Sequence, residues 1–181
     1  MSEKSQTLRF SRISLRNWKN FAQTDIQLQR RVFLVGPNAS GKSNFLDVFR
    51  FLCDLALPGG GFQDAVQRRG GVNSLRCLAA RRYSHIEIRV AVESGQAGCL
   101  WEYELAFNQD KQRQAYIQKE RVLRDGTILL DRPNTEDRDD PARLTQTHIE
   151  QVNVNRPFRE LVAFFESVRY FAYRTTTGAG A

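Results

Sequence analysis

The residues with the clearest chemical potential form one stretch, Gly36-Pro37-Asn38-Ala39-Ser40-Gly41-Lys42-Ser43. The stretch matches the P-loop pattern of a glycine, four residues, Gly-Lys and then Ser or Thr. Glycines at both ends allow the backbone to curl, so that successive N–H groups converge on an anion. Lys42 supplies a positive charge for the outer phosphates of a nucleotide, and the Ser43 hydroxyl is a ligand suited to Mg²⁺. The pattern predicts a site for ATP and Mg²⁺.

The residues assigned to this site share one short segment, and no catalytic residue is assigned. The predicted Mg²⁺ ligand is Ser43. The predicted nucleotide-binding residues are Gly36, Pro37, Asn38, Ala39, Ser40, Gly41, Lys42, Ser43 and Asn44. The alternative interpretation is a glycine turn with an incidental lysine. Residue types alone do not distinguish ATP from GTP.

A P-loop needs a strand before it and a helix after it, and both are predicted. Val32 to Val35 is a continuous apolar run, which is typical of a strand covered on both faces. From Lys42 to about Leu55 the apolar residues recur at helical spacing. The N-terminus of that helix would add unpaired N–H groups and the positive end of its dipole. These two elements favour the P-loop interpretation over the incidental turn.

The rest of the chain is rich in predicted strands. Strands are expected at 8–15, with an irregularity in the middle, and at 24–29, 85–92, 100–107, 115–123 and 127–130. Asp125-Gly126 separates the last two and predicts a hairpin. A turn with two aromatic anchors is expected at 17–21, short helices at 62–68 and 156–165, an exposed loop at 131–143 and a final strand at 168–173.

Composition indicates a soluble protein. Apolar residues make up 41% and charged residues 26% of the 181 residues, and no apolar run is long enough to cross a bilayer. We therefore expect a cytoplasmic protein without membrane contact. The net charge of +7 is compatible with DNA as a partner, although the basic residues are scattered. Three widely spaced cysteines and two isolated histidines predict neither a metal site nor a redox pair.

The residues around the loop resemble the N-terminal lobe of ABC-type ATPases in the SMC, RecF and OLD-nuclease branch. The resemblance rests on two short strands, the turn N-W-K-N-F, the segment GPNASGKSN and the following FLDVFRFL. Ala39 stands where the branch more often has glycine, whereas the residues that fit that pattern are Asn38, Ser40, Asn44, Leu46 and Asp47. The stretch from Gly59 to Leu78 looks especially like bacterial AAA-labelled ATPases of the OLD-like group, several of which serve phage defence.

The resemblance implies an α/β fold of the ABC-head type. A mixed sheet would surround the P-loop helix, and an antiparallel β-subdomain would be attached to it. In such proteins two heads sandwich ATP and drive an effector or DNA. Lys19 stands where some relatives place a basic residue near the nucleotide, although a solvated turn lysine explains it equally well.

The family's catalytic parts have no match in the chain. Ile128 to Asp131 looks superficially like the strand that ends in Asp-Glu, but Arg132 follows it, and we interpret it as the return arm of the hairpin. Neither a signature loop nor a switch histidine is found. Relatives carry these parts in a second lobe. We therefore expect an N-terminal lobe over residues 1–174 and a disordered tail at 175–181, in a chain that is truncated or is completed by another chain. Within the lobe we expect a P-loop core (8–57), a connector (58–82), a β-subdomain (83–131), the loop (131–143) and a helix and strand (144–174).

Three functions remain open at this stage. The first is an ATP-binding head with little hydrolysis of its own, working with a second lobe, a homodimer partner or an effector nuclease chain. The second is a small P-loop kinase, which the strand-rich middle of the chain disfavours. The third is a non-catalytic nucleic-acid-binding regulatory fragment that retains the loop.

Overall fold

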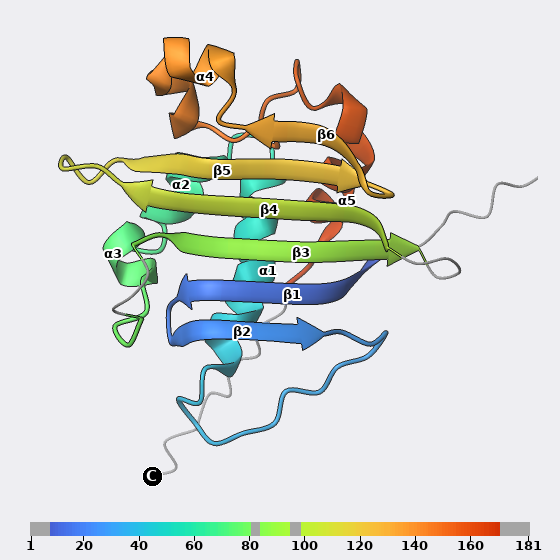
Figure 1. Cartoon of the computed structure of the whole chain (residues 1–181). Helices are drawn as coiled ribbons and strands as arrows, with labels where there is room; N and C mark the ends of the chain where they lie inside the picture. The colour runs from blue at the N-terminus through green and yellow to red at the C-terminus, as the bar shows by residue number, and fades with distance from the viewer. Residues whose placement is uncertain (1–7, 81–83, 95–98, 171–181) are drawn as a thin grey trace, which may run out of the picture.

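The computed structural model describes residues 8–80, 84–94 and 99–170. Its strands form one six-stranded antiparallel sheet in the order β2-β1-β3-β4-β5-β6 (Figure 1). The strands are β1 (Leu8–Trp18), β2 (Phe21–Gln27), β3 (Ile86–Ser94), β4 (Cys99–Gln109), β5 (Ala115–Arg124) and β6 (Thr127–Arg132). Each strand after β3 follows its neighbour directly, whereas β1 pairs with β3 across a long excursion of the chain.

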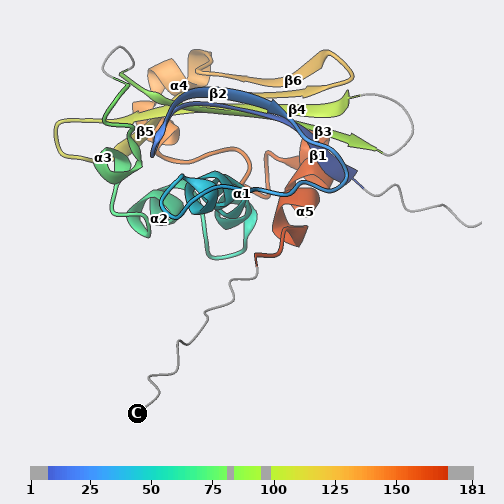
Figure 2. The ribbon, with the colours of Figure 1, turned by 90° about the horizontal axis from the view of Figure 1, so that it is seen from below.

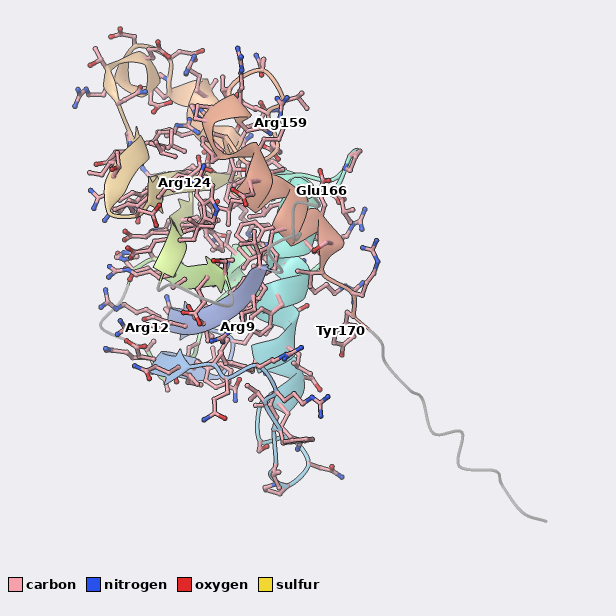
Figure 3. All side chains as sticks on the ribbon, turned by 90° about the vertical axis from the view of Figure 1, so that its right-hand side faces the viewer. Arg9, Arg12, Arg124, Arg159, Glu166 and Tyr170 are labelled. Atoms are coloured by element: carbon pink, nitrogen blue, oxygen red, sulfur yellow. The ribbon has the colours of Figure 1, made fainter. Side chains whose placement is uncertain are left out.

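Alternating side chains give the sheet one apolar and one charged face. In β3, Ile88 and Val90 are buried while Arg89 between them is exposed. In β1, Ile13 is buried and the neighbouring Arg12 pairs with Asp25 of β2 at 2.6 Å. Figure 3 shows Arg12 on the face of the sheet that points away from α1. The period of two in the sequence therefore decides which face packs against the helices.

Most of the helices lie against the apolar face of the sheet (Figure 2), whereas the short helix at 135–139 lies beyond the edge strand β6 (Figure 1). The helices are α1 (Lys42–Ala56), α2 (Phe62–Gln67), α3 (Val72–Leu75), α4 (Thr135–Asp139) and α5 (Arg159–Ser167), with 3-10 turns at Pro141–Thr145 and Arg156–Phe158. None of the helices within the described residues is long and apolar enough to span a bilayer.

Aromatic rings join α1 to the sheet. Phe51 of α1 lies 5.4 Å from the ring of Trp18 and 5.7 Å from that of Phe107, measured between ring centroids. All three side chains are fully buried or nearly so. Large buried rings in contact contribute strongly to core stability, so this cluster fixes α1 against β1 and β4.

Most of the predicted elements are confirmed. The helix from Lys42 ends at Ala56, the hairpin at Asp125-Gly126 joins β5 to β6, and β1 has a bulge between Phe10 and Arg12. The segment from Ile128 to Asp131 is indeed the return arm of that hairpin. The expected helix at 156–165 begins as a 3-10 turn and continues to Ser167.

The strand predicted at Val32 to Val35 is wrong for this structure. These residues form no strand, and Phe33 and Val35 are 85% and 93% exposed. A strand needs a neighbour for its hydrogen bonds, and no described segment pairs with this run. Without a strand at 32–35, all strand pairs of the described sheet are antiparallel, whereas we expected a sheet of mixed strand directions. Apolar composition predicts that a segment should be covered, but not what covers it.

The loop predicted at 131–143 is also wrong. It contains the helix α4, whose N-cap Asn134 accepts the backbone N–H of Asp137, while the Asp137 side chain accepts the N–H of Asn134. Arg132 and Asp137 are each 1% exposed. We interpreted the many charges as solvated, but two of them neutralise each other inside the protein.

Two smaller expectations have different outcomes. Residues 168–170 form no strand, and the remainder of the strand predicted at 168–173 lies outside the described residues, as does the expected tail at 175–181. Cys53 and Cys77 are buried free thiols, in agreement with an incidental role.

Candidate nucleotide-binding site

The segment from Gly36 to Ser43 is a curled, exposed turn at the start of α1. Asn38 and Ala39 form the turn, and the Ser40 N–H donates to the Pro37 carbonyl at 3.3 Å. Ala39 and Gly41 both have positive φ, at 62° and 98°. A left-handed backbone conformation costs little free energy at glycine but more at alanine. Glycine would therefore adopt the conformation of Ala39 at a lower cost.

The Lys42 side chain hydrogen-bonds to the backbone of this turn. Its ammonium donates to the carbonyl oxygens of Gly36 at 2.7 Å and Pro37 at 2.6 Å. Among the described residues, no carboxylate forms an ion pair with Lys42. The charge is therefore held at the loop by neutral dipoles and remains available to an anion.

The first turn of α1 is uncapped. Gly41 at its N-cap makes no side-chain hydrogen bond, and the first turn has no acidic residue. The first intrahelical bond runs from the Phe45 N–H to the Gly41 carbonyl at 2.9 Å. The N–H groups that precede it are free of helical partners by geometry, which is how helix N-termini bind phosphates. The donor set fits a polyphosphate.

The described part of the site offers few protein ligands for a metal ion. Ser43 is exposed at the start of α1, next to the loop. The described residues contain no cluster of three or more His, Cys, Asp or Glu side chains that could hold a metal ion. Mg²⁺ commonly takes few protein ligands and completes its shell with water and nucleotide phosphates. A single hydroxyl is therefore compatible with a magnesium–nucleotide complex but not with a separate protein-held metal.

Asp47, one turn along α1, is engaged by two cations. Lys19 lies 2.6 Å and Arg69 2.9 Å from its carboxylate oxygen. Burial raises the pKa of Asp47, but hydrogen bonds from Arg69 and Lys19 outweigh it and bring the pKa below its ordinary value. Asp47 is therefore an ionised structural partner. Lys19 is paired, which corrects the solvated-lysine interpretation and places its ammonium on α1.

Arg69 was not identified from the sequence. Its guanidinium also contacts Asp54 at 2.8 Å and lies 5.1 Å from the ring of Phe51. Asp47 and Asp54 are seven residues apart on one face of α1, and that spacing is the signal that could have indicated a shared cation.

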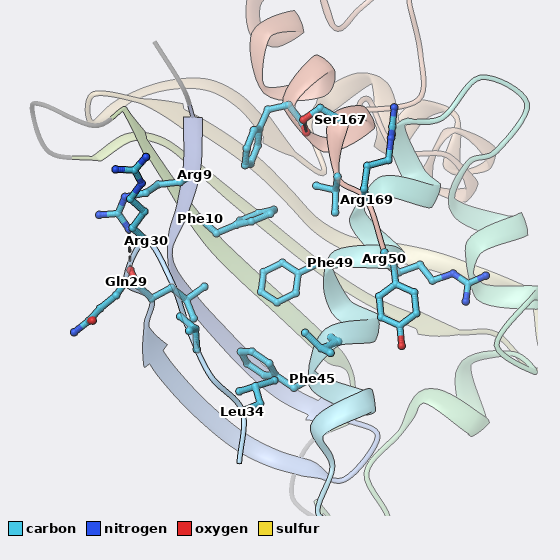
Figure 4. A pocket seen from close by; sticks show the side chains of 16 residues that line it. Arg9, Phe10, Gln29, Arg30, Leu34, Phe45, Phe49, Arg50, Ser167 and Arg169 are labelled. Carbon is cyan, nitrogen blue, oxygen red and sulfur yellow. Dashed lines mark hydrogen bonds between the residues drawn. The ribbon is translucent and has the colours of Figure 1, made fainter. Parts of the chain in front are cut away.

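A cavity of about 480 Å³ lies beside the same helix but does not include the loop. Figure 4 shows Phe10, Phe45 and Phe49 on its floor and Arg9, Arg30, Arg50 and Arg169 around it. It opens between α1, the segment after β2 and the end of α5. The predicted nucleotide-binding residues lie in the loop, apart from this cavity.

The structure thus brings together the predicted residues 36–44, with Asn44 held by the side chain of Asn20 at 3.0 Å. Sequence patterns did not reveal Asn20, since its contact spans 24 positions. Nucleotide binding by these residues stays a prediction.

Comparisons with known proteins find similarities over parts of the chain. Endonuclease GajA of Bacillus cereus (strain VD045) is 38% identical over 55 residues, which cover 30% of this chain and 10% of that protein. Two solved structures are similar in part: the recombination mediator protein RecF bound to ATP, and an SMC ATPase studied for ATP-driven dimerization and DNA-stimulated activation. The first has a TM-score of 0.42 and 18% identity and covers 67% of this chain and 28% of RecF. The second has a TM-score of 0.40 and 14% identity and covers 67% of this chain and 72% of the other. At these scores neither structure carries a conclusion about this chain.

The chain spans only a small part of GajA and of RecF. A family model described as "AAA domain, putative AbiEii toxin, Type IV TA system" matches residues 31–166, which contain the loop, α1, most of the sheet and all but the last residue of α5. The chain therefore belongs to this family of AAA domains.

Proposed function

We propose that this chain binds ATP with Mg²⁺ through the loop Gly36–Ser43. The observation that carries the proposal is the position of the Lys42 ammonium, held 2.6–2.7 Å from two loop carbonyls and, among the described residues, paired with no carboxylate. A polyphosphate would offer that ammonium stronger, charged acceptors. Family membership supports a nucleotide as the ligand.

Each part of the loop has a separate role in the proposal. The backbone N–H groups and the uncapped start of α1 orient the phosphates, and Lys42 neutralises charge on the outer ones. Ser43 supplies the protein ligand for Mg²⁺, which supplies further charge neutralisation when it is bound with the nucleotide.

Binding of this kind does not by itself hydrolyse ATP. Hydrolysis requires a group that orients the attacking water, and the loop residues serve only to position and neutralise phosphates. Asp47, the carboxylate one turn along α1, is occupied by Lys19 and Arg69. We therefore infer negligible turnover by this chain alone.

We also propose that the chain acts as part of a larger ATPase. The run Val32 to Val35 supports this, because Phe33 and Val35 are exposed and such side chains are costly to leave in water. A second ATPase lobe, a homodimer partner or an effector nuclease chain would cover it. Such an assembly would use ATP to drive an effector or a DNA transaction. The partial match to an endonuclease and a family description that includes a toxin support an effector role, with phage defence as the setting that we propose.

Isothermal titration calorimetry of Mg-ATP with Lys42→Ala tests the proposal. Because a charged hydrogen-bond donor to phosphate is lost, affinity should fall by about 1.5–3 kcal/mol, roughly 10- to 150-fold in Kd. Lys111→Ala is the matched control, since Lys111 is exposed in the turn between β4 and β5 and its removal changes net charge equally. Equal affinity in wild type and Lys42→Ala would contradict the assignment.

A further inference from the structure

Three consecutive residues at the end of β1 bond to the beginning of α1. The Trp18 indole N–H donates to the Asn44 carbonyl at 3.0 Å. The Lys19 ammonium lies 2.6 Å from the Asp47 carboxylate. The side-chain amide of Asn44 donates to Asn20 Oδ1 at 3.0 Å. Asn44 directly follows Lys42 and Ser43, so this turn holds the helix at the point where it meets the loop.

The turn itself is held firmly. Asn17 and Lys19 have positive φ, at 57° and 49°, a conformation that non-glycine residues adopt only when their surroundings impose it. The buried Asn17 amide donates to the His85 carbonyl at 3.1 Å, and its oxygen accepts the Cys77 N–H at 3.0 Å. The Lys19 N–H donates to the Leu75 carbonyl at 2.6 Å. The turn is therefore a fixed support rather than a yielding one.

Asn20 differs from its neighbours because it is exposed and yet lies directly against the loop. A Cβ on Gly41 would lie closer to the Asn20 side-chain nitrogen than nonbonded atoms approach. Gly41 also has φ of 98°, a conformation that disfavours a side chain, and the Asn20 amide occupies the space that a Cβ would need. Asn20 thus limits the space of the loop on one side and accepts a bond from Asn44 on the other.

We propose that Asn20 is a positioning residue for the phosphate-binding loop, acting through Asn44 and Gly41. The proposal rests on the proposed function, that the loop binds ATP. Asn20 keeps the loop curled and the first turn of α1 in place before the nucleotide arrives. Less conformational freedom is then lost on binding, which raises affinity without a new contact to the ligand.

The test is Mg-ATP affinity, measured by calorimetry on the full chain, for Asn20→Ala, Asn44→Ala and the double variant. Asn20→Ala should weaken binding about 3- to 10-fold, the range expected for loss of one hydrogen bond. The losses of affinity in the two single variants should not add up in the double variant, because both changes remove the same bond. Gln112→Ala, which deletes an exposed side-chain amide in the β4–β5 turn, is the control and should bind as wild type does.

Stability separates positioning from a merely structural role. Because Asn20 is exposed, the urea midpoint of the nucleotide-free chain should be nearly unchanged in Asn20→Ala. Asn20→Ser serves as a second variant and should also lose affinity, since its shorter side chain cannot reach Asn44. Wild-type affinity in both variants, fully additive losses in the double variant, or a loss of stability that accounts for the loss of binding would overturn the inference.

The outcomes also distinguish this inference from the proposed function. If wild type binds Mg-ATP, Lys42→Ala does not and Asn20→Ala binds normally, only the positioning role fails. If wild type itself does not bind, the proposed function fails and the positioning role fails with it.

Discussion

Arg132 and Lys42 both bond to backbone carbonyls, but in opposite settings. Arg132 is fully buried, and its guanidinium donates to Glu120 at 3.0 Å, to Asp137 at 2.7 Å and to the carbonyls of Arg143 and Gln146. Lys42 is bonded to two carbonyls of its own loop and, among the described residues, to no carboxylate. Carboxylates within the fold neutralise the charge of Arg132, whereas the described partners of Lys42 do not neutralise its charge. The Lys42 charge is therefore available to an anionic ligand, whereas the Arg132 charge is not.

The largest expected effect tests the structural member of this pair. Arg132→Met leaves Glu120 and Asp137 buried without their partner, and removal of one member of a buried ion pair typically costs roughly 3–5 kcal/mol. Urea denaturation should show a loss of that order. The matched control is Arg138→Met, because Arg138 is exposed and its guanidinium donates to the Thr135 hydroxyl at 3.3 Å, a neutral partner.

Substitutions of Lys42 and Arg132 should differ in their effect on stability. Lys42→Ala should change the unfolding free energy far less than Arg132→Met, because the hydrogen bonds of Lys42 to described residues lie within its own loop. A large loss of stability in Lys42→Ala would mean that Lys42 is structural too.

A smaller effect concerns the pH dependence of the buried cluster around Arg132. Burial, and next the positive charge of Arg132, lower the pKa of His148 from 6.5 to about 4. The folded state thus disfavours the protonated form. Stability is fully present above pH 6.5 and is lost as pH falls toward 4. By linkage the loss at pH 5 is about 2 kcal/mol relative to neutral pH.

His148→Gln isolates this effect, because glutamine does not titrate. Urea unfolding at pH 7 and pH 5 should show a smaller loss of stability in the variant than in wild type. Equal losses in the two proteins would show that His148 is not held neutral by its buried surroundings.

The parts that sequence could predict are those set by local pattern. Helical spacing predicted α1, Asp125-Gly126 predicted the hairpin, and the glycine and lysine spacing predicted the loop. Burial of Arg132 depended on Glu120, twelve positions away on a neighbouring strand, so the charge density around it suggested an exposed loop.

The same limit applies to the site. The support from Asn20 spans 24 positions, and no local pattern reveals it. The run Val32 to Val35 shows the opposite error. Its apolar composition predicted a buried strand, but Phe33 and Val35 are exposed among the described residues. Local patterns gave the elements, and long-range partners decided which of their charges are neutralised.

The most direct test of the central claim is a ¹H–¹⁵N NMR titration of the full chain with Mg-ATP. We propose that the loop N–H groups and the Lys42 ammonium, whose described partners are uncharged, together bind a polyphosphate. We predict that the largest amide shifts fall on residues 38–44 and that Lys42→Ala, titrated identically, shows them only at much higher nucleotide concentration. Saturable binding that leaves the amides of 38–44 unmoved, or identical titrations of wild type and Lys42→Ala, would contradict the account.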